Sequence, residues 1–367
     1  MIILIALVLI IFKPFGKKTD PTRDILASAV TTPTQAPAQN AETGNALLDA
    51  ADTEETQTQY SSISEMLADA DSQVQGLSEA DMAQVSDLSI NQSLPSDWLN
   101  VLLMGTDERT LSDSARTDSM MICSINRTTG EVKLASIMRD LAIEYTDIGK
   151  WNGTYRINAA NYFGGPKLAM KTINEKFGMN IQNYVMVNFF GFQKIAQRLG
   201  GIDIDITEAE MQQINKLIVQ QAKIAYKAGV DESDQENVYL ESYGENTHLN
   251  GRQTLAYARI RKIDNDYARS QRQQLVLQKL MEKVKGLSAV EVGVLLNDMM
   301  GQIKTNMPAN DILNTALVVL KNGASGFDSM RLPVTGTYSE ERRNDEAMLW
   351  DCDFATNQLE LYNFIYE

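Results

Sequence analysis

The basic stretch LAYARIRKIDNDYARSQRQ, at residues 255–273, holds side chains well suited to binding an anion. Its cations are Arg259, Arg261, Lys262, Arg269 and Arg272. Guanidinium groups suit phosphate because their planar fork donates two parallel hydrogen bonds. Arg259 and Arg261 are two residues apart, so in an extended segment both face one side. The stretch therefore indicates a site for a phosphate-bearing ligand.

The second half of this stretch has helical spacing. Gln273 follows Arg269 by four residues and Arg272 follows it by three, which places all three on one helix face. Asp264 and Asp266 are close enough in sequence to brace the guanidinium groups. For Arg272 alone, a solvated surface charge explains the residue as well as a binding role does.

More charged residues stand at the ends of three predicted strands. Asp107 and Arg109 follow the first strand, Arg116 and Asp118 precede the second, and Arg139 and Asp140 follow the third. If these strands are neighbours, the ends of the first and third share one edge of the sheet. Two carboxylates among arginines suit Mg²⁺, which is held by one or two carboxylates plus phosphate oxygens of a substrate.

The chain lacks the residues and motifs of several other kinds of catalytic, metal and nucleotide-binding site. His248 is the only histidine, which excludes Ser-His-Asp triads and zinc sites rich in histidine. No Walker A sequence is present, and no GxGxxG follows a strand. Cys123 and Cys352 are too few for a structural zinc site. They are either a disulfide or two unpaired thiols, and the sequence leaves both open.

The acidic balance of the chain disfavours nucleic acid as a partner. The formal charge is −15, and Asp24 to Asp97 contains 13 carboxylates without a Lys or Arg. Proteins that bind DNA or RNA gain affinity from a net basic face. The basic stretch also lacks interleaved aromatic residues for stacking on bases.

The N-terminal residues predict a membrane anchor over 1–18. MIILIALVLIIF is wholly apolar but short for a span of about 20 residues, and basic residues follow it. No small-residue cleavage site follows. We expect the true N-terminus to lie upstream and the rest of the chain to be extracytoplasmic, on a single-pass membrane protein. The alternative is a short hydrophobic end on a cytoplasmic protein.

Residues 19–96 have the composition of an acidic, low-complexity stalk, and 97–367 that of a folded domain. In that domain we predict strands at 101–104, 119–126, 131–138, 184–189, 202–206 and 327–334, with the turn RTTG joining the second and third. Helices are predicted at 166–177, from Phe190 to a stop at Gly200, and at 207–228, 250–258, 266–286, 288–303 and 309–322. Interleaved strands and helices indicate an α/β fold, an α-β-α sandwich around a central mixed sheet.

Several motifs, in fixed order, resemble the LytR-CpsA-Psr (LCP) family of bacterial cell-wall proteins. They are NVLLMGTDER, RTDSMMICSINRTTGEVKLASIMRD, RINAANYFGG, NFFGFQKIAQRLGGIDIDI and LNGRQTLAYARIRKIDNDYARSQRQ. The resemblance runs from about Trp98 to Leu287, with a family-like end to about residue 366. IMRD replaces the more usual IPRD, which leaves Arg139 and Asp140 in register.

The resemblance implies an extracytoplasmic, Mg²⁺-dependent phosphotransferase. It would move a glycopolymer from a polyprenyl-pyrophosphate carrier to the C6 hydroxyl of a muramic sugar in peptidoglycan. Polyprenyl phosphate would leave, and a hydrophobic tunnel in the sandwich would hold the lipid. The polymer itself, whether teichoic acid, capsule or another wall glycan, stays open, as does the oligomeric state.

The resemblance also implies roles for the matched residues. Asp107 and Asp118 would bind Mg²⁺. The pyrophosphate would be clamped by Arg116, Arg139, Arg259, Arg261 and Arg269, with Asp266 and Gln273 supporting the clamp. Arg116, Asp118, Arg139 and Asp140 would form the catalytic set, and either Asp118 or Asp140 would be the general base. Leu275, Leu277 and Leu280 line either the tunnel or, as we prefer, the core.

The segment 208–247, between GGIDIDI and LNGRQTLAYAR, is longer than the family motifs require. This segment is predicted to be an insertion, which is either a surface elaboration or a segment that covers the lipid entrance or contacts the glycan. Two other functions fit the same residues. Water in place of the sugar hydroxyl would give a polyprenyl-pyrophosphate hydrolase, and a non-enzymatic protein that binds lipid phosphate could regulate wall assembly.

Overall fold

The structure is a computed structural model that describes most of the chain after residue 86. The described residues are 87–106, 116–228, 239–260, 263, 272, 275–276, 278–280, 282–284, 287–321, 328–343 and 346–367, without the side chains of Asp118, Phe189, 223–228 and Ala289. The predicted anchor and all but the last residues of the predicted stalk lie outside these ranges. In the described part, no helix is both long and apolar enough to cross a membrane.

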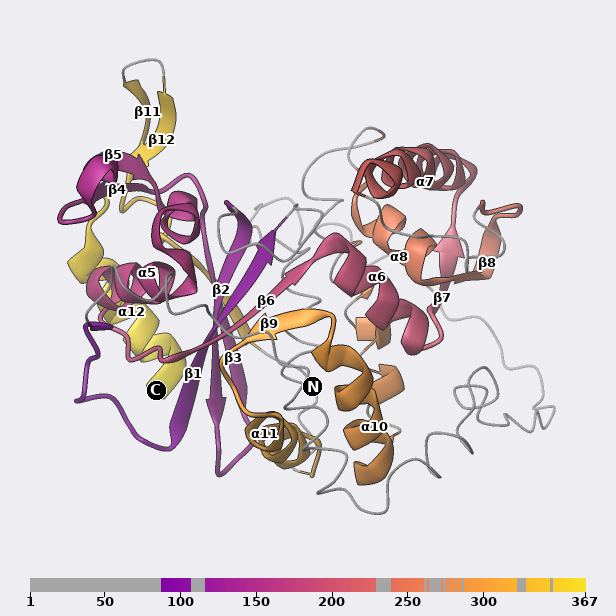
Figure 1. The fold of residues 1–367 in the computed structure, drawn as a ribbon, viewed down its shortest axis with the longest axis horizontal. Coiled ribbons are helices and arrows are strands. Elements are labelled where there is room, and N and C mark those ends of the chain that lie inside the picture. The colour runs from indigo at the N-terminus through magenta and orange to yellow at the C-terminus, as the bar shows by residue number, and fades with distance from the viewer. Residues whose placement is uncertain are drawn as a thin grey trace, which may run out of the picture.

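A mixed sheet runs through the centre of the described part (Figure 1). Its strands, in spatial order, are β10 (Asp328–Leu332), β3 (Val132–Ile137), β2 (Thr117–Asn126), β1 (Trp98–Thr106), β6 (Asn183–Asn188) and β9 (Ile303–Thr305). The pairs β10–β3 and β1–β6 are parallel, and the other three pairs are antiparallel. The predicted hairpin is therefore confirmed, with its turn at residues 127–130.

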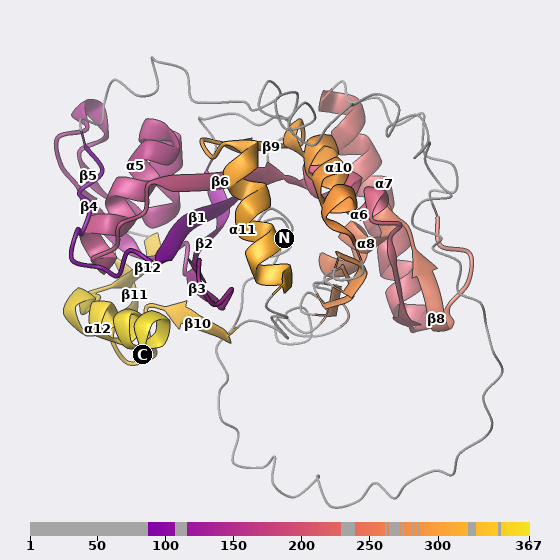
Figure 2. The ribbon, with the colours of Figure 1, turned by 90° about the horizontal axis from the view of Figure 1, so that it is seen from below.

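Both faces of the sheet are buried, as the apolar run in β1 requires. Val101 and Leu103 point into one core, and Leu102 and Met104 point into the other. The first core is covered by α6 (Phe189–Arg198), α7 (Glu208–Ala228), α8 (Gly251–Ala258), α10 (Ala289–Met300) and α11 (Ala309–Lys321). The second is covered by α5 (Ala160–Phe177) and α12 (Phe354–Tyr366). Figure 2 shows the sheet between these helices, which confirms the α-β-α arrangement.

Among the described residues, three two-stranded ribbons surround the main sheet. They pair β4 (Ala142–Tyr145) with β5 (Gly153–Arg156), β7 (Ile202–Ile206) with β8 (Gly244–Leu249), and β11 (Ser339–Arg343) with β12 (Glu346–Trp350). The short 3₁₀ helices η2 (Gly149–Trp151) and η3 (Ile157–Ala159) flank β5. The β11–β12 hairpin projects from the body (Figure 1).

Some predicted boundaries were wrong. The helix predicted to end at residue 303 ends at Met300, and Ile303 begins β9. Helix α5 begins at Ala160 rather than at 166, although Gly164 and Gly165 leave helical geometry inside it, as expected of a glycine pair in a turn. Within 266–286, the described residues 272, 275–276, 278–280 and 282–284 are helical. Cys123 is buried, Cys352 is half-buried, and both thiols are free.

Candidate active site at one edge of the sheet

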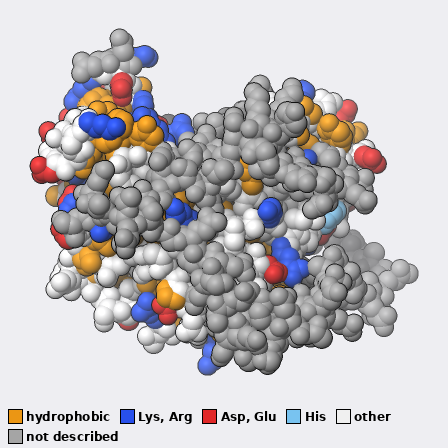
Figure 3. Space-filling view, in the orientation of Figure 1, with side chains coloured by type: hydrophobic (Ala, Val, Ile, Leu, Met, Phe, Trp, Pro, Cys, Tyr) orange, Lys and Arg blue, Asp and Glu red, His pale blue; other side chains and the backbone are white. Residues whose placement is uncertain are grey.

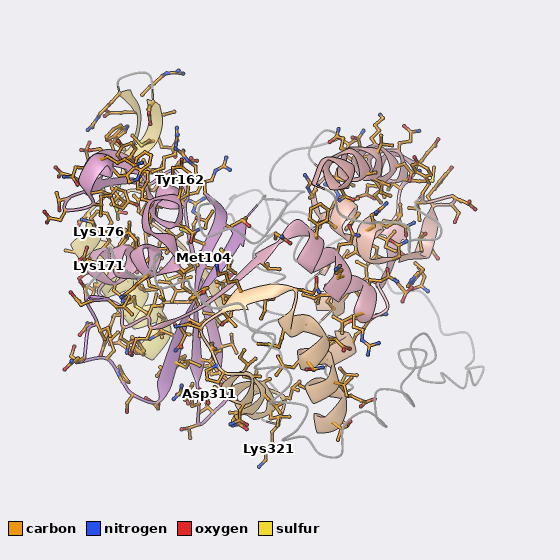
Figure 4. The ribbon with its side chains drawn as sticks, viewed as in Figure 1. Met104, Tyr162, Lys171, Lys176, Asp311 and Lys321 are labelled. Atoms are coloured by element: carbon orange, nitrogen blue, oxygen red, sulfur yellow. The ribbon has the colours of Figure 1, made fainter. Side chains whose placement is uncertain are left out.

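The strand register brings three predicted charged segments to one edge of the sheet. Met120 of β2 is opposite Met104 of β1 on one side and Ile137 of β3 on the other. Because β1 and β3 both run antiparallel to β2, they end at the edge where β2 begins. The chain reaches that edge just before Asp107, at Arg116, and just before Arg139. Met104, labelled in Figure 4, lies near this end of β1.

A break in the β1–β2 register falls at Asp118. Gly105 is opposite Ser119 and Thr106 is opposite Thr117, so Asp118 is the extra residue in β2. An extra residue of this kind is a β-bulge, and bulges are over-represented next to active sites. The irregularity therefore marks the position that the sequence predicts as a ligand and candidate base.

The two predicted Mg²⁺ ligands occupy sequence positions at this edge of the sheet, and both are carboxylates. Asp107 directly follows Thr106, the last residue of β1. Thr106 is opposite Thr117, which directly precedes Asp118. Carboxylates are the ligands that Mg²⁺ prefers. Asp107 lies outside the described residues, as does the Asp118 side chain. Among the described side chains, no three His, Cys, Asp or Glu residues form a metal-binding group.

Arg139 and Asp140 are brought together with a third residue, Arg156. Asp140 Oδ1 is 3.7 Å from Arg139 Nε and 3.2 Å from Arg156 Nε. The second contact is ionic, since Arg156 Nε has no aligned hydrogen bond. These side chains are 29–40% exposed, so solvent screens the attraction. The Asp140 carboxylate is thus already engaged by two guanidinium groups.

Arg156 joins this cluster to the projecting hairpin. Its Nη2 donates to the carbonyl oxygen of Ala347 at 3.0 Å, and its Nη1 is 3.9 Å from a Glu346 oxygen. The backbone N–H of Leu349 donates to the Asp140 carbonyl oxygen at 2.9 Å. Sequence reasoning missed Arg156 as a site residue. The signal was available, because Arg156 opens the RINAANYFGG motif.

Buried polar groups lie beside the same edge. Thr106, Thr117 and Asn158 are all buried, and Thr117 Oγ1 donates a long, 3.5 Å bond to the Asn158 carbonyl oxygen. Within the described part of the chain, Thr106 Oγ1 and Asn158 Oδ1 have no hydrogen-bond partner. Buried polar groups usually have a partner, so these two oxygens are suited to accept hydrogen bonds from a ligand or from neighbouring segments.

The basic stretch begins in α8, which belongs to the helical layer over the first core. Arg259 directly follows α8 as its C-cap and is half-buried, and Ile260 after it is buried in the first core. Arg116 is exposed at the start of β2. The other predicted ligands of the stretch lie outside the described residues: Arg261, Asp266, Arg269 and Gln273. Figure 3 shows several Lys and Arg side chains in the middle of one face of the molecule.

The apolar residues after the basic stretch belong mainly to the core. Leu280 is fully buried in the first core, and Leu275 packs against it. Leu277 lies outside the described residues. Core packing was the preferred interpretation, and Leu280 supports it. Arg272 is also buried, in an ion pair with Glu210.

The fold and the charged edge describe an α/β sandwich suited to a phosphate-bearing ligand. The model of the LytR_cpsA_psr family matches residues 58–358, and the chain belongs to this family. The match begins inside the segment predicted as a stalk. It includes every predicted ligand and catalytic residue.

Two curated relatives and one solved structure are similar to this chain. Regulatory protein MsrR of Staphylococcus aureus strain Mu50 is 29% identical over 273 residues, which are 73% of this chain and 75% of the relative. Polyisoprenyl-teichoic acid--peptidoglycan teichoic acid transferase TagU of Bacillus mycoides strain KBAB4 is 29% identical over 280 residues, or 76% and 81%. A structure of TagT bound to LI-WTA is 25% identical with a TM-score of 0.52, covering 76% of this chain and 95% of that one.

Proposed function

We propose that this protein is a phosphotransferase that joins a glycopolymer to peptidoglycan. The donor is a polyprenyl-pyrophosphate-linked glycan, and the acceptor is the C6 hydroxyl of a muramic sugar. The family match over residues 58–358 carries the proposal, because it includes every proposed ligand and catalytic residue. The name of the relative TagU, a teichoic acid transferase acting on peptidoglycan, supports it further.

The proposed reaction exchanges one P–O bond for another. The acceptor oxygen attacks the phosphorus that bears the glycan, and the bond from this phosphorus to the bridging oxygen breaks. Polyprenyl phosphate leaves with that oxygen, and the acceptor proton passes to a carboxylate. The product is a phosphodiester. Such a reaction needs positioning and charge neutralisation more than covalent catalysis.

Arginines supply the charge neutralisation in this proposal. Arg116 and Arg139 reach the donor from the sheet edge, and Arg259, Arg261 and Arg269 reach it from the basic stretch. Asp266 and Gln273 support those arginines. Asp140 is paired with two guanidinium groups, so its role is to hold Arg139 and Arg156 in place. Asp118, at the β-bulge, is then the better candidate for the general base.

Asp107 and Asp118 would hold Mg²⁺. When bound, Mg²⁺ would neutralise charge on the pyrophosphate oxygens. The register at Thr106 and Thr117 supports this assignment, because it brings the segments that carry the two carboxylates to one edge.

A lipid-linked donor also explains why the enzyme would need the predicted membrane anchor. An enzyme held by residues 1–18 would share its membrane with the donor, with the catalytic domain on the extracytoplasmic side. A hydrophobic tunnel within the sandwich would hold the polyprenyl chain. Apolar side chains cover both faces of the sheet, so a tunnel along either face would have an apolar lining.

A regulatory function is the second candidate, since the relative MsrR is named a regulatory protein. The same site would then bind a lipid phosphate without turning it over. Hydrolysis of the pyrophosphate is a third outcome, in which water replaces the sugar hydroxyl.

The test combines the purified full-length chain with a polyprenyl-pyrophosphate-linked saccharide and peptidoglycan fragments, with Mg²⁺ or with a chelator. Mass spectrometry measures glycan joined to a fragment through phosphate. We expect the product with Mg²⁺, and about a hundredfold less from Arg139→Ala, because one charged donor to the transferred group is lost.

Arg127→Ala is the matched control, since Arg127 is exposed in the turn at the opposite end of the same hairpin. It should transfer at the wild-type rate. Release of free glycan phosphate alone would favour the hydrolase. Tight binding of an intact donor, with every acceptor, would favour the regulatory protein.

A further inference from the structure

A buried ion pair links the basic stretch to the first turn of helix α7. Arg272 Nε is 2.9 Å from Glu210 Oε1, and the two side chains are only 9% and 13% exposed. The Arg272 guanidinium also lies over the Tyr257 ring of α8, at 5.9 Å from its centroid. Arg272 is therefore held between α7 and α8.

The Glu210 carboxylate is fixed from its other side by the start of its own helix. Its Oε2 accepts hydrogen bonds from the backbone N–H of Thr207 at 3.0 Å and from Thr207 Oγ1 at 2.9 Å. The Glu210 N–H donates to Thr207 Oγ1 at 3.3 Å in return. This reciprocal arrangement is a capping box, which orients the glutamate at a helix start. Glu210 thus has one oxygen for the helix and one for Arg272.

Helix α7 itself is anchored in the core. Ile214 and Ile218 are fully buried in the first core, where residues of α8 also pack. The helix opens the segment 208–247 that the sequence marks as an insertion. At least its first turns are part of the domain, and Glu210 is a rigid point from which to hold a neighbouring segment.

We propose that Glu210 is a positioning residue for the donor-binding stretch, acting through Arg272. This inference rests on the proposed function. Arg272 directly precedes Gln273 and follows Arg269 by three residues, and both of those are assigned to the pyrophosphate. By fixing Arg272, Glu210 sets where those neighbours meet the donor. The insertion then contributes to donor binding without touching the donor.

The test is Glu210→Gln in the full-length chain. Glutamine still accepts from Thr207, so the capping box survives, while the charge opposite Arg272 is lost. We expect the KM for the lipid-linked donor, or the Kd for polyprenyl pyrophosphate alone, to rise about tenfold or more, because small displacements of binding groups have large effects. The KM for the peptidoglycan acceptor should stay unchanged.

Asp298→Asn is the matched control. It breaks the Arg198–Asp298 ion pair, which joins α6 to α10 at 2.6 Å and does not involve the basic stretch. Its donor KM should stay within about twofold of wild type, whatever its melting temperature. Arg272→Gln and the double variant Glu210→Gln/Arg272→Gln complete a cycle. If the two residues act as one unit, the double variant should be no worse than the poorer single variant.

An unchanged donor KM in Glu210→Gln, with transfer intact, would overturn this inference and leave the proposed function standing. Equal donor effects in Glu210→Gln and Asp298→Asn would also overturn it, because the cause would then be general loss of stability. A wild-type chain that neither binds polyprenyl pyrophosphate nor transfers glycan would refute the proposed function, and this inference with it.

Discussion

Gly251→Ala should destabilise the domain although alanine is normally the better helix residue. Gly251 is the first residue of α8, at the contact with α6. A Cβ there would lie 2.2 Å from the carbonyl oxygen of Gln193 and 2.6 Å from the backbone nitrogen of Gln197. Both are backbone atoms of α6, so no side-chain rotation can relieve the overlap. The two helices must move apart.

The expected size follows from two opposing terms. Alanine in place of glycine favours a helix by up to about 1 kcal/mol. Overpacking a dense interior costs about 1–3 kcal/mol, and contacts this short place Gly251 at the upper end. The net loss is about 2 kcal/mol. For a domain of this size, that lowers the melting temperature by about 4–8 °C.

Urea unfolding followed by circular dichroism would measure this change. The donor KM should rise too, because α8 leads directly into Arg259. Gly336→Ala is the control. Gly336 has φ +91°, and no atom of the described residues lies within 4 Å of the place that a Cβ would take, so its cost comes from backbone strain alone, remote from α8. A Gly251→Ala variant as stable as wild type would refute the close approach of α6 and α8.

Three further outcomes are expected. Asp118→Asn should lower transfer about a thousandfold, because it removes both a proposed Mg²⁺ ligand and the proposed base. Asp140→Asn, whose carboxylate is paired with two guanidinium groups, should lower it only about tenfold, and equal losses would contradict the different roles proposed for the two carboxylates. Ser288→Ala should cost about 1 kcal/mol at neutral pH by removing the cap of α10. The Ser288 side chain, followed by its backbone N–H, lowers the pKa of Glu291 from its ordinary value. Only the side-chain bond is lost in the variant, so this part of the difference is present above the ordinary pKa and should shrink as the pH falls through the lowered one. Burial, followed by the nearby Asp353 charge, raises the pKa of Cys352 to about 11, so thiol reagents at pH 8 should react slowly with the native chain. After unfolding without reductant, the same reagents should titrate both thiols. If no thiol can be titrated after unfolding, the two cysteines form a disulfide.

Most of the central sheet could be predicted from the sequence because its signals are local, but the three-residue strand β9 was not. The run Val101–Met104 is apolar on both faces, and RTTG is a turn between two such strands. Those two features predicted the strands and the hairpin, but the shared edge of β1 and β3 was expected only if the strands were neighbours. The structure supplies that strand order and so brings the charged residues to one edge.

Apart from β7, which was predicted at 202–206, the strands of the small ribbons could not be predicted in the same way. Strand β8, GENTHL, is mostly exposed and polar, and it is a strand only because it pairs with β7. Strands β4 and β5 have four residues each and form around a non-local pairing. Arg156 reaches Asp140 from β5, so the missed ribbon concealed a residue of the site.

Helix α12 was missed although a signal was present. Asp353 caps it by accepting from the Thr356 N–H, and the buried Leu361 and Ile365 are four residues apart. The Glu210–Arg272 pair had no comparable signal. It joins residues 62 positions apart, and only the packing of α7 against α8 brings them together.

The fate of oxygen in ¹⁸O-labelled water is the measurement that tests the central proposal most directly. The full-length chain would act on the lipid-linked saccharide and peptidoglycan fragments in this water, and mass spectrometry would read every phosphate-bearing product. The proposed transfer predicts glycan joined to the fragment by a phosphodiester that contains no ¹⁸O, because the attacking oxygen comes from the sugar. Glycan phosphate carrying one ¹⁸O, with no joined product, would contradict it.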